Sequence, residues 1–368
     1  MPLSPHFPDR GTESMQPASL DERSIGTARV YGRGIADDKA PIVMHLIALK
    51  RWLATPVAGR IHLKYLLDGE EEAGSPHIEA SLGRNRQLLE SDLLVLCDGP
   101  MDALSRRSVY LGARGDMHLR LRVRTGAQPA HSGNYGLLPN AAWRLSSLLS
   151  SMKQPDGRVT IDGFEEDVLA PTAAEKEILA EASRAETAIA GQLGVAAFEG
   201  DPAVPYYERL LFHPGFSINQ LSAGRPGNQI PVTAEALMEV RLVARQDPKK
   251  VFEAIRRHVM ARMPDVEIDY LDGVPAARMD PGELTISRAL KAATRAEGGR
   301  VLVYPSLGGT LPLLDAFTAA GHKYVGLPLV NFDNNQHVGN ENLEVSVLPD
   351  GIEYLVHLLD ELAVMQGS

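Results

Sequence analysis

The sequence predicts an α/β protein built on a parallel sheet, interrupted by a second domain built on an antiparallel sheet. Helical and strand-like segments alternate over residues 29–98, and the apolar run 93–97 is typical of a strand buried on both faces. Residues 117–124 instead alternate strictly between apolar and basic side chains. Such alternation is typical of an antiparallel sheet with one solvated face, so two kinds of sheet are expected.

Composition excludes several classes of protein. With 368 residues, 44% of them hydrophobic, the chain is long enough for two domains with sizeable cores. Its 37 basic and 47 acidic residues give a net charge of −10, which argues against nucleic acid or an anionic membrane as the main partner. No apolar run approaches the roughly 20 residues of a membrane span, and the single cysteine, Cys97, allows no intramolecular disulfide. We therefore expect a cytoplasmic protein.

The first domain is expected to occupy residues 1–113 and 277–368. After an irregular start, apolar residues recur at helical spacing from Ile42 to Leu53, and this helix is expected to pack on the sheet. Its other elements are predicted as strands at 61–67, 92–97, 301–304 and 324–327, and helices at 76–89, 284–297 and 350–365.

The second domain is expected as an insertion at residues 114–276. Its elements follow an order that resembles a split βαβ, or ferredoxin-like, α+β unit. After the strand at 117–124 we predict helices at 140–152, 172–192 and 247–262, and strands at 216–221, 236–243 and 266–271.

An acidic cluster follows the predicted strand 61–67. Residues 70–72 are three consecutive glutamates, and like charges so close repel one another unless protons or cations neutralise them. A solvated acidic turn is the alternative to a metal site. Asp37, Asp98 and His337 stand near turns or strand ends elsewhere, and ligands of parallel sheets gather beyond the carboxyl ends of strands.

Five motifs occur in the chain in a fixed order: YGRGIADDK at 31–39, DGEEEAGS at 68–75, DGP at 98–100, AHSG at 130–133 and HVGNE at 337–341. From residue 29 to the end the chain resembles the M20 metallopeptidases, most closely their dipeptidase and carnosinase-like branch. The resemblance implies a catalytic domain with an inserted lid and dimerisation domain. It also implies hydrolysis of the amide bonds of dipeptides or small peptides.

The resemblance implies two divalent metal ions, with zinc expected and manganese or cobalt as alternatives. Asp37 would bridge the ions, Glu72 and His337 would complete one site, and Asp98 would belong to the other. Glu71 would be the general base that takes a proton from water and passes it to the leaving nitrogen. Other readings stay open, because Asp37 could be a helix N-cap, Asp98 a turn residue and His337 solvent-exposed.

Substrate contacts are implied for the inserted domain. His131 resembles the histidine that reaches across a homodimer to the partner subunit's active site. Arg241 matches the arginine that clamps a terminal carboxylate, and Thr310, after two glycines, would complete that pocket. Alternatively, Arg241 faces solvent on an amphipathic strand and the glycines make a plain turn. The substrate would be a small peptide or an N-acyl amino acid.

In one respect the sequence departs from the family. Relatives carry an upstream His-x-Asp motif whose histidine is a ligand of the second metal. This chain has no such motif, and its only upstream histidine is His6, so one metal site is expected to keep only Asp37 and Asp98. We expect a start recorded downstream of the true one or a truncated gene, or else a catalytically impaired relative that acts only as a metal-binding dimer. Within the superfamily, the alternative activity is that of an aminoacylase or N-deacetylase.

Overall fold

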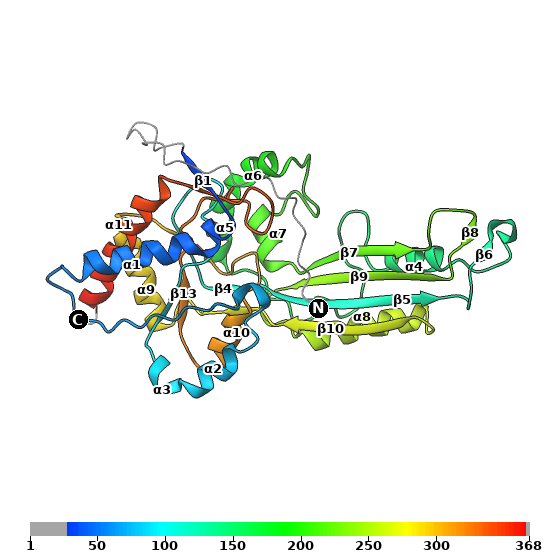
Figure 1. Ribbon diagram of the computed structural model, residues 1–368, viewed down its shortest axis with the longest axis horizontal. Coiled ribbons are helices and arrows are strands. Elements are labelled where there is room, and N and C mark those ends of the chain that lie inside the picture. The colour runs from blue at the N-terminus through cyan, green and yellow to red at the C-terminus, as the bar shows by residue number, and fades with distance from the viewer. Residues whose placement is uncertain (1–27, 366–368) are drawn as a thin grey trace.

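The computed structural model describes residues 28–365 and is elongated, with a helix-rich body at one end and a four-stranded sheet at the other (Figure 1). His6, the upstream histidine considered above, lies outside the described residues. Within this range, no helix combines the length and apolar character needed to cross a bilayer.

The body contains a four-stranded sheet in the order β12-β3-β13-β2. β12 runs parallel to β3 and β13 runs parallel to β2, but β13 is antiparallel to β3. The sheet is therefore mixed, whereas a purely parallel sheet was expected. At the antiparallel contact the Tyr110 ring lies against Gly326, where an added Cβ would come within 1.9 Å of the ring. The four strands are β2 (Leu94–Leu96), β3 (Ser108–Tyr110), β12 (Leu302–Tyr304) and β13 (Tyr324–Gly326).

Helices surround this sheet. A short antiparallel pair of strands joins the N-terminal and C-terminal parts of the body. Strand β1 (Arg29–Tyr31) pairs antiparallel with β14 (Asn342–Glu344). This pairing places the turn after β1 beside the loop before β14, and both belong to the candidate site. The helices of the body are α1 (Ala40–Trp52), α2 (Ile78–Arg84), α3 (Arg86–Leu89), α9 (Leu284–Ala296), α10 (Pro312–Ala319) and α11 (Val347–Met365).

Helix α1 forms as expected, but it buries a different face from the one predicted. Val43, Leu46 and Ile47 are 48%, 53% and 38% exposed. The buried stripe contains Met44 and Trp52 and packs toward α11, where Gly351 leaves room for the Met44 thioether. The sequence therefore carries two apolar stripes on one helix, and periodicity alone does not show which one packs.

Residues 61–67 were predicted as a strand, and this prediction is wrong for the described structure. The segment is extended but unpaired, because no backbone hydrogen bond joins it to any other part of residues 28–365. Its side chains Leu63, Tyr65, Leu66 and Leu67 are 40–63% exposed. A strand needs a neighbour for its amides and carbonyls, and apolar content does not supply one.

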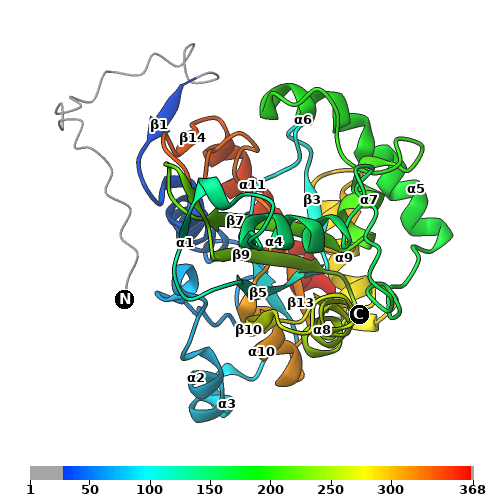
Figure 2. The ribbon, with the colours of Figure 1, turned by 90° about the vertical axis from the view of Figure 1, so that its right-hand side faces the viewer.

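The second sheet matches the predicted antiparallel layer. Its order is β10-β5-β9-β7, all neighbours are antiparallel, and Met117, Leu119, Leu121 and Val123 are buried on one face. Helices α4 (Ala141–Ser150) and α8 (Pro248–Arg262) cover that face (Figure 2). The strands are β5 (Gly115–Arg124), β7 (Gly215–Ala223), β9 (Thr233–Leu242) and β10 (Glu267–Val274), and the short pair β6 (Ala130–His131) with β8 (Gln229–Ile230) lies beyond them.

Three helices in the predicted insertion return to the body. They are α5 (Ala173–Ala182), α6 (Glu186–Leu193) and α7 (Tyr206–Phe212). Leu179 and Phe212 are buried in the same core as β3 and α9, whereas β5 and α8 belong to a separate core. We keep 114–276 as the proposed extent of the insertion, with these helices docked on the first core.

The chain passes between the two cores through a narrow crossing of two antiparallel segments. Strand β4 (Gly112–Ala113) pairs with β11 (Ala277–Arg278) immediately before β5 and after β10. An added Cβ at Gly112 would lie 1.9 Å from the carbonyl oxygen of Ala277, and one at Gly115 would lie 2.4 Å from that of Val274. Only glycine allows the two backbones to approach so closely.

We expect the substitution Gly112→Ala to lower the free energy of unfolding by about 2 kcal/mol or more, because the new methyl group must push β11 away. Gly83→Ala is the matched control, since nothing lies within 4 Å of its Cβ position in α2. Alanine there should be neutral or stabilise by up to about 1 kcal/mol. Urea unfolding of both variants checks this, and equal stabilities would contradict the crossing geometry.

Candidate active site

Glu341 organises the loop that carries the two adjacent aspartates. The residue is only 4% exposed, and its carboxylate accepts backbone N–H bonds from Gly34 at 2.8 Å, Ala36 at 3.1 Å and Asp37 at 3.2 Å. Gly34 adopts a left-handed φ of 75°, which turns these amides toward one point. Burial alone would raise the pKa of Glu341, but the three amide bonds, together with the charge of Arg33, outweigh it and the net pKa is lowered. The carboxylate is therefore a fixed anchor for the loop.

Three of the predicted ligands converge beside this anchor. The His337 Nε2 atom lies 3.0 Å from Asp37 Oδ2 and 3.1 Å from Glu72 Oε2. One donor atom from each residue lies within 4.8 Å of the other two, which is an arrangement that could hold a metal ion. Asp37 is 13% exposed, whereas Glu72 and His337 are 51% and 59% exposed, so the group opens to solvent on one side.

The three glutamate side chains of the acidic turn do not share one environment. The Asp68 carboxylate accepts bonds from the Glu70 amide at 2.8 Å and the Ser75 hydroxyl at 2.6 Å, which closes the loop. Glu70 points to His77, whose Nδ1 lies 2.8 Å away, while Glu72 points to His337. The triplet is therefore not a uniformly solvated turn.

A second group of carboxyls lies deeper, and their mutual repulsion is visible in their pKa values. Burial and then Asp98 raise the pKa of Asp38 to about 9. Burial, with Asp98 next, raises the pKa of Glu71 to about 7, and burial followed by Asp37 raises that of Asp98 to about 6. One oxygen of Asp38, Oδ1, is buried without a hydrogen-bond partner in the described chain. Anionic oxygens so arranged fit divalent cations, which would replace the missing protons.

The structure also brings Arg241 and Thr310, the two residues predicted to bind a terminal carboxylate, into contact with each other. Arg241 Nη1 donates to the Thr310 hydroxyl at 2.7 Å, and the same guanidinium lies 2.5 Å from Glu239 and 3.9 Å from Asp116. His131 is not brought to either group. It is exposed on β6, at the end of the long sheet remote from the body (Figure 1), where Nδ1 accepts the Gly133 amide at 3.1 Å.

Comparison with known proteins fits this geometry. The sequence profile of peptidase family M20/M25/M40 matches residues 8–361. The chain belongs to this family.

Several M20 relatives can be aligned with it. A cysteinylglycine-S-conjugate dipeptidase from Corynebacterium striatum is 28% identical over 306 residues, covering 81% of this chain and 65% of that protein. A human beta-Ala-His dipeptidase is 25% identical, covering 86% and 65%. An M20 family metallo-carboxypeptidase from Sulfolobus solfataricus superposes with a TM-score of 0.80 at 25% identity, covering 93% and 80%. The chain thus spans about two thirds of the length of these curated dipeptidases.

The structure bears on the alternative roles of Asp37, Asp98 and His337 as a helix cap, a turn residue and a solvent-exposed residue. Asp37 makes no side-chain capping bond to α1, whose N-cap residue is Lys39. Asp98 lies two residues beyond the end of β2, with its carboxyl near the other acidic groups. His337 is exposed to solvent, as the alternative predicted, but its ring also contacts two carboxylates.

Glu341 and Asp38 belong to the sequence motifs, but no role was predicted for either residue. Glu341 follows His337 by four positions, and its function depends on three backbone amides that no side-chain pattern reveals. Asp38 directly follows Asp37, and two adjacent acidic residues were the signal that could have marked it.

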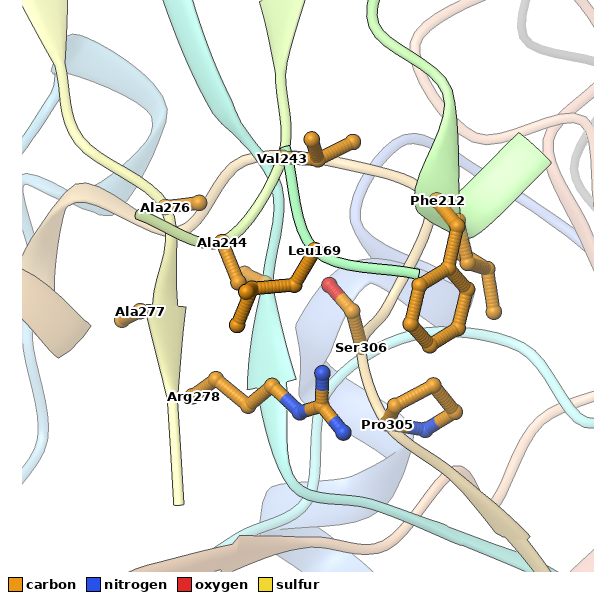
Figure 3. Close-up of a pocket in the computed structure, with 11 residues that line it drawn as sticks. Leu169, Phe212, Val243, Ala244, Ala276, Ala277, Arg278, Pro305 and Ser306 are labelled. Atoms are coloured by element: carbon orange, nitrogen blue, oxygen red, sulfur yellow. The ribbon is translucent and has the colours of Figure 1, made fainter. Parts of the chain in front are cut away.

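A small cavity lies at the crossing of this M20 protein, away from both groups (Figure 3). It has about 10 Å³ of room, roughly that of one water molecule, so it is too small for a peptide. The Arg278 guanidinium lies along it, 5.4 Å from the Phe212 ring centre, and forms an ion pair with Glu175.

The raised pKa values predict how stability depends on pH. Asp38, Glu71 and Asp98 titrate at about 9, 7 and 6, against ordinary values of 3.8, 4.5 and 3.8. The folded state therefore keeps protons that the unfolded chain loses. This stabilising contribution is complete below pH 3.8 and is lost as the pH rises through 6, 7 and 9.

With divalent ions removed by EDTA, we expect the urea midpoint to fall between pH 6 and pH 8.5. Zn²⁺ added at each pH should reduce this fall, because the bound cation favours the ionised carboxylates. Identical slopes with EDTA and with Zn²⁺ would contradict the carboxyl cluster as a cation site.

Proposed function

We propose that the chain is a metal-dependent hydrolase that cleaves amide bonds of dipeptides or small peptides. The observation that carries this proposal is the convergence of Asp37, Glu72 and His337, contributed by three distant segments, beside the raised-pKa carboxyl of Glu71. Membership of the M20 family and the dipeptidase relatives support it.

Divalent ions are implied by the family, and the donor set fits them. Asp37, Glu72 and His337 would hold one ion, and Asp98 with Asp37 would contribute to a second. Two carboxylates and an imidazole suit Zn²⁺, with Mn²⁺ or Co²⁺ as alternatives. When bound, such ions supply Lewis-acid polarisation of the substrate carbonyl and lower the pKa of water.

Glu71 is the proposed general base. It is adjacent to Glu72 but is not part of the His337 group, and its pKa of about 7 lets it accept and release a proton near neutral pH. It would take the proton of the attacking water and deliver it to the leaving nitrogen. A base with an ordinary glutamate pKa would be a weaker acceptor for this task.

Arg241 and Thr310 would bind the terminal carboxylate of the substrate. Their side chains already contact each other at 2.7 Å, and a guanidinium beside a hydroxyl suits a planar anionic group. Substrates of dipeptidases and carboxypeptidases both carry such a carboxylate, as do the N-acyl amino acids of the aminoacylase alternative. His131 would serve the active site of a second subunit, so a homodimer is part of the proposal. The buried lone Cys97 supports a cytoplasmic location.

A second candidate is a metal-binding dimer with little turnover. It is favoured by the solvent exposure of Glu72 and His337 and by the unpaired segment 61–67 next to the acidic turn. Water that reaches the site freely weakens every electrostatic contribution there. Stoichiometric metal binding without hydrolysis across dipeptide and acyl-amino-acid panels would select this candidate.

The three neighbouring glutamates provide a matched test. We expect Glu71→Gln to reduce kcat by about 10²–10⁴-fold while metal content is retained, because it removes a proton acceptor and not a ligand. Glu72→Gln should instead lower metal content. Glu70→Gln should change neither, since Glu70 points to His77.

Metal content by mass spectrometry and dipeptide hydrolysis are measured on the same preparations. If Glu71→Gln loses the metal and Glu72→Gln keeps it, the two proposed roles are reversed. If Glu71→Gln retains full activity, the proposed base is wrong.

For the carboxylate pocket we expect Arg241→Ala to raise KM for a dipeptide by about 10–100-fold, because a charge-assisted bidentate contact is lost. The KM for the same dipeptide with a C-terminal carboxamide should change little. Arg225→Ala, at an exposed arginine of the same domain, is the control. Equal effects of Arg241→Ala on both substrates would place the pocket elsewhere.

A further inference from the structure

A buried arginine stands at the crossing between the two cores. Arg114 lies between β4 and β5 and is 5% exposed. A buried guanidinium is costly unless its donors are satisfied, and the Arg114 Nε atom has no hydrogen-bond partner in the described chain. The partners of its Nη2 atom therefore indicate what the side chain holds.

The backbone of Arg114 holds the loop that carries Thr310. Its N–H donates to the carbonyl of Gly309 at 3.0 Å and, more weakly, to that of Leu307 at 3.3 Å. Leu307 in turn donates its N–H to the carbonyl of Gly112 at 2.7 Å. The Thr310 loop is thus fastened to the crossing by main-chain bonds that do not depend on the arginine side chain.

The side chain of Arg114 holds the other half of the pocket. Its Nη2 donates to the carbonyl of Arg241 at 2.9 Å and to that of His213 at 3.0 Å. These carbonyls lie near the end of β9 and just before β7. Gly215 pairs with Arg241 there, and a Cβ added to Gly215 would lie 3.3 Å from the Arg241 Cβ, so a larger side chain would require a shift. The contacts therefore form a closed cycle. The Arg114 backbone bonds to Gly309, the neighbouring Thr310 bonds to Arg241, and the Arg241 carbonyl bonds to the Arg114 side chain.

Charge gives Arg114 a second effect on the pocket. Arg241 stands between two carboxylates, Glu239 at 2.5 Å and Asp116 at 3.9 Å, which by themselves would oppose an incoming anion. Burial, with Arg241 next, lowers the pKa of Arg114 to about 10, so it remains a cation at neutral pH. Two cations then balance two carboxylates, and without Arg114 the surroundings of Arg241 would be net negative.

We propose that Arg114 is a positioning and specificity-determining residue, whose guanidinium fixes Arg241 opposite Thr310 and offsets the carboxylates that would repel an anionic substrate terminus. It does not touch the substrate itself. The inference rests on the proposed function in one respect only, namely that the Arg241–Thr310 pair binds a carboxylate.

The test measures binding, so it does not require hydrolysis. The probe is a reduced-amide analogue of Ala-Ala, with CH₂–NH in place of the peptide group, compared with the same analogue ending in a carboxamide. Calorimetry on the full chain with Zn²⁺ present gives the ratio of the two Kd values. Wild type should prefer the carboxylate by roughly tenfold or more.

Arg114→Met should abolish this preference, since both the charge and the two carbonyl contacts are lost. Arg114→Lys keeps the charge, but its ammonium ends one bond short of the Nη2 atom that donates to both carbonyls, so it should reduce the preference at least about threefold. Arg278→Met is the matched control, because Arg278 lies at the same crossing and is directed to Phe212 and Glu175. It should lower the melting temperature without changing the ratio.

Three results would overturn the inference: a folded Arg114 variant with the wild-type ratio, an Arg278→Met protein that loses the ratio equally, or a wild type without carboxylate preference. If Arg114→Met does not fold, Arg114→Lys decides. A wild type that shows the preference but hydrolyses no dipeptide would refute the proposed chemistry and leave the role of Arg114 intact. A wild type that hydrolyses dipeptides without preferring the carboxylate would refute the role of Arg114 and leave the proposed chemistry intact.

Discussion

The structure depends on holding several carboxyls of like charge close together. Burial raises the pKa values of Asp37, Asp38, Glu71 and Asp98, and neighbouring carboxylates raise them further. Such a group would separate in a flexible chain. Here it is kept together because the Glu341 carboxylate fixes the aspartate loop through three backbone amides, and Asp98 follows the end of β2 by two residues. Bound cations would offset this electrostatic cost, in keeping with the proposed metal site.

The narrow crossing connects this group to the rest of the molecule. At Gly112 and Gly115 the two passing segments lie so close that neither position has room for a Cβ atom. Arg114, between them, contacts the body through its backbone and the long sheet through its side chain. The proposed carboxylate pocket is therefore assembled from both cores, and its two halves stay in register only while the crossing holds them.

Much of this could be predicted from the sequence, where the signal was local or carried by a motif. The alternation of residues 117–124 predicted the buried face of β5. Asp37, Glu72 and His337, which the motifs had singled out, lie close together in the structure. Features that depend on a neighbour could not be predicted. Helix α1 carries two apolar stripes, and the choice between them is made by α11.

The unpaired segment 61–67 has a consequence for the behaviour of the protein in solution. Its apolar side chains lie beside amides and carbonyls with no partner in the described chain, near the uncovered stripe of α1. Surfaces of this kind recruit strands from other molecules, and nothing in residues 61–67 except Lys64 acts as a charged gatekeeper. Concentrated preparations would accordingly self-associate from this side first. A charge at Leu66, or a mild detergent, is the natural remedy for handling them.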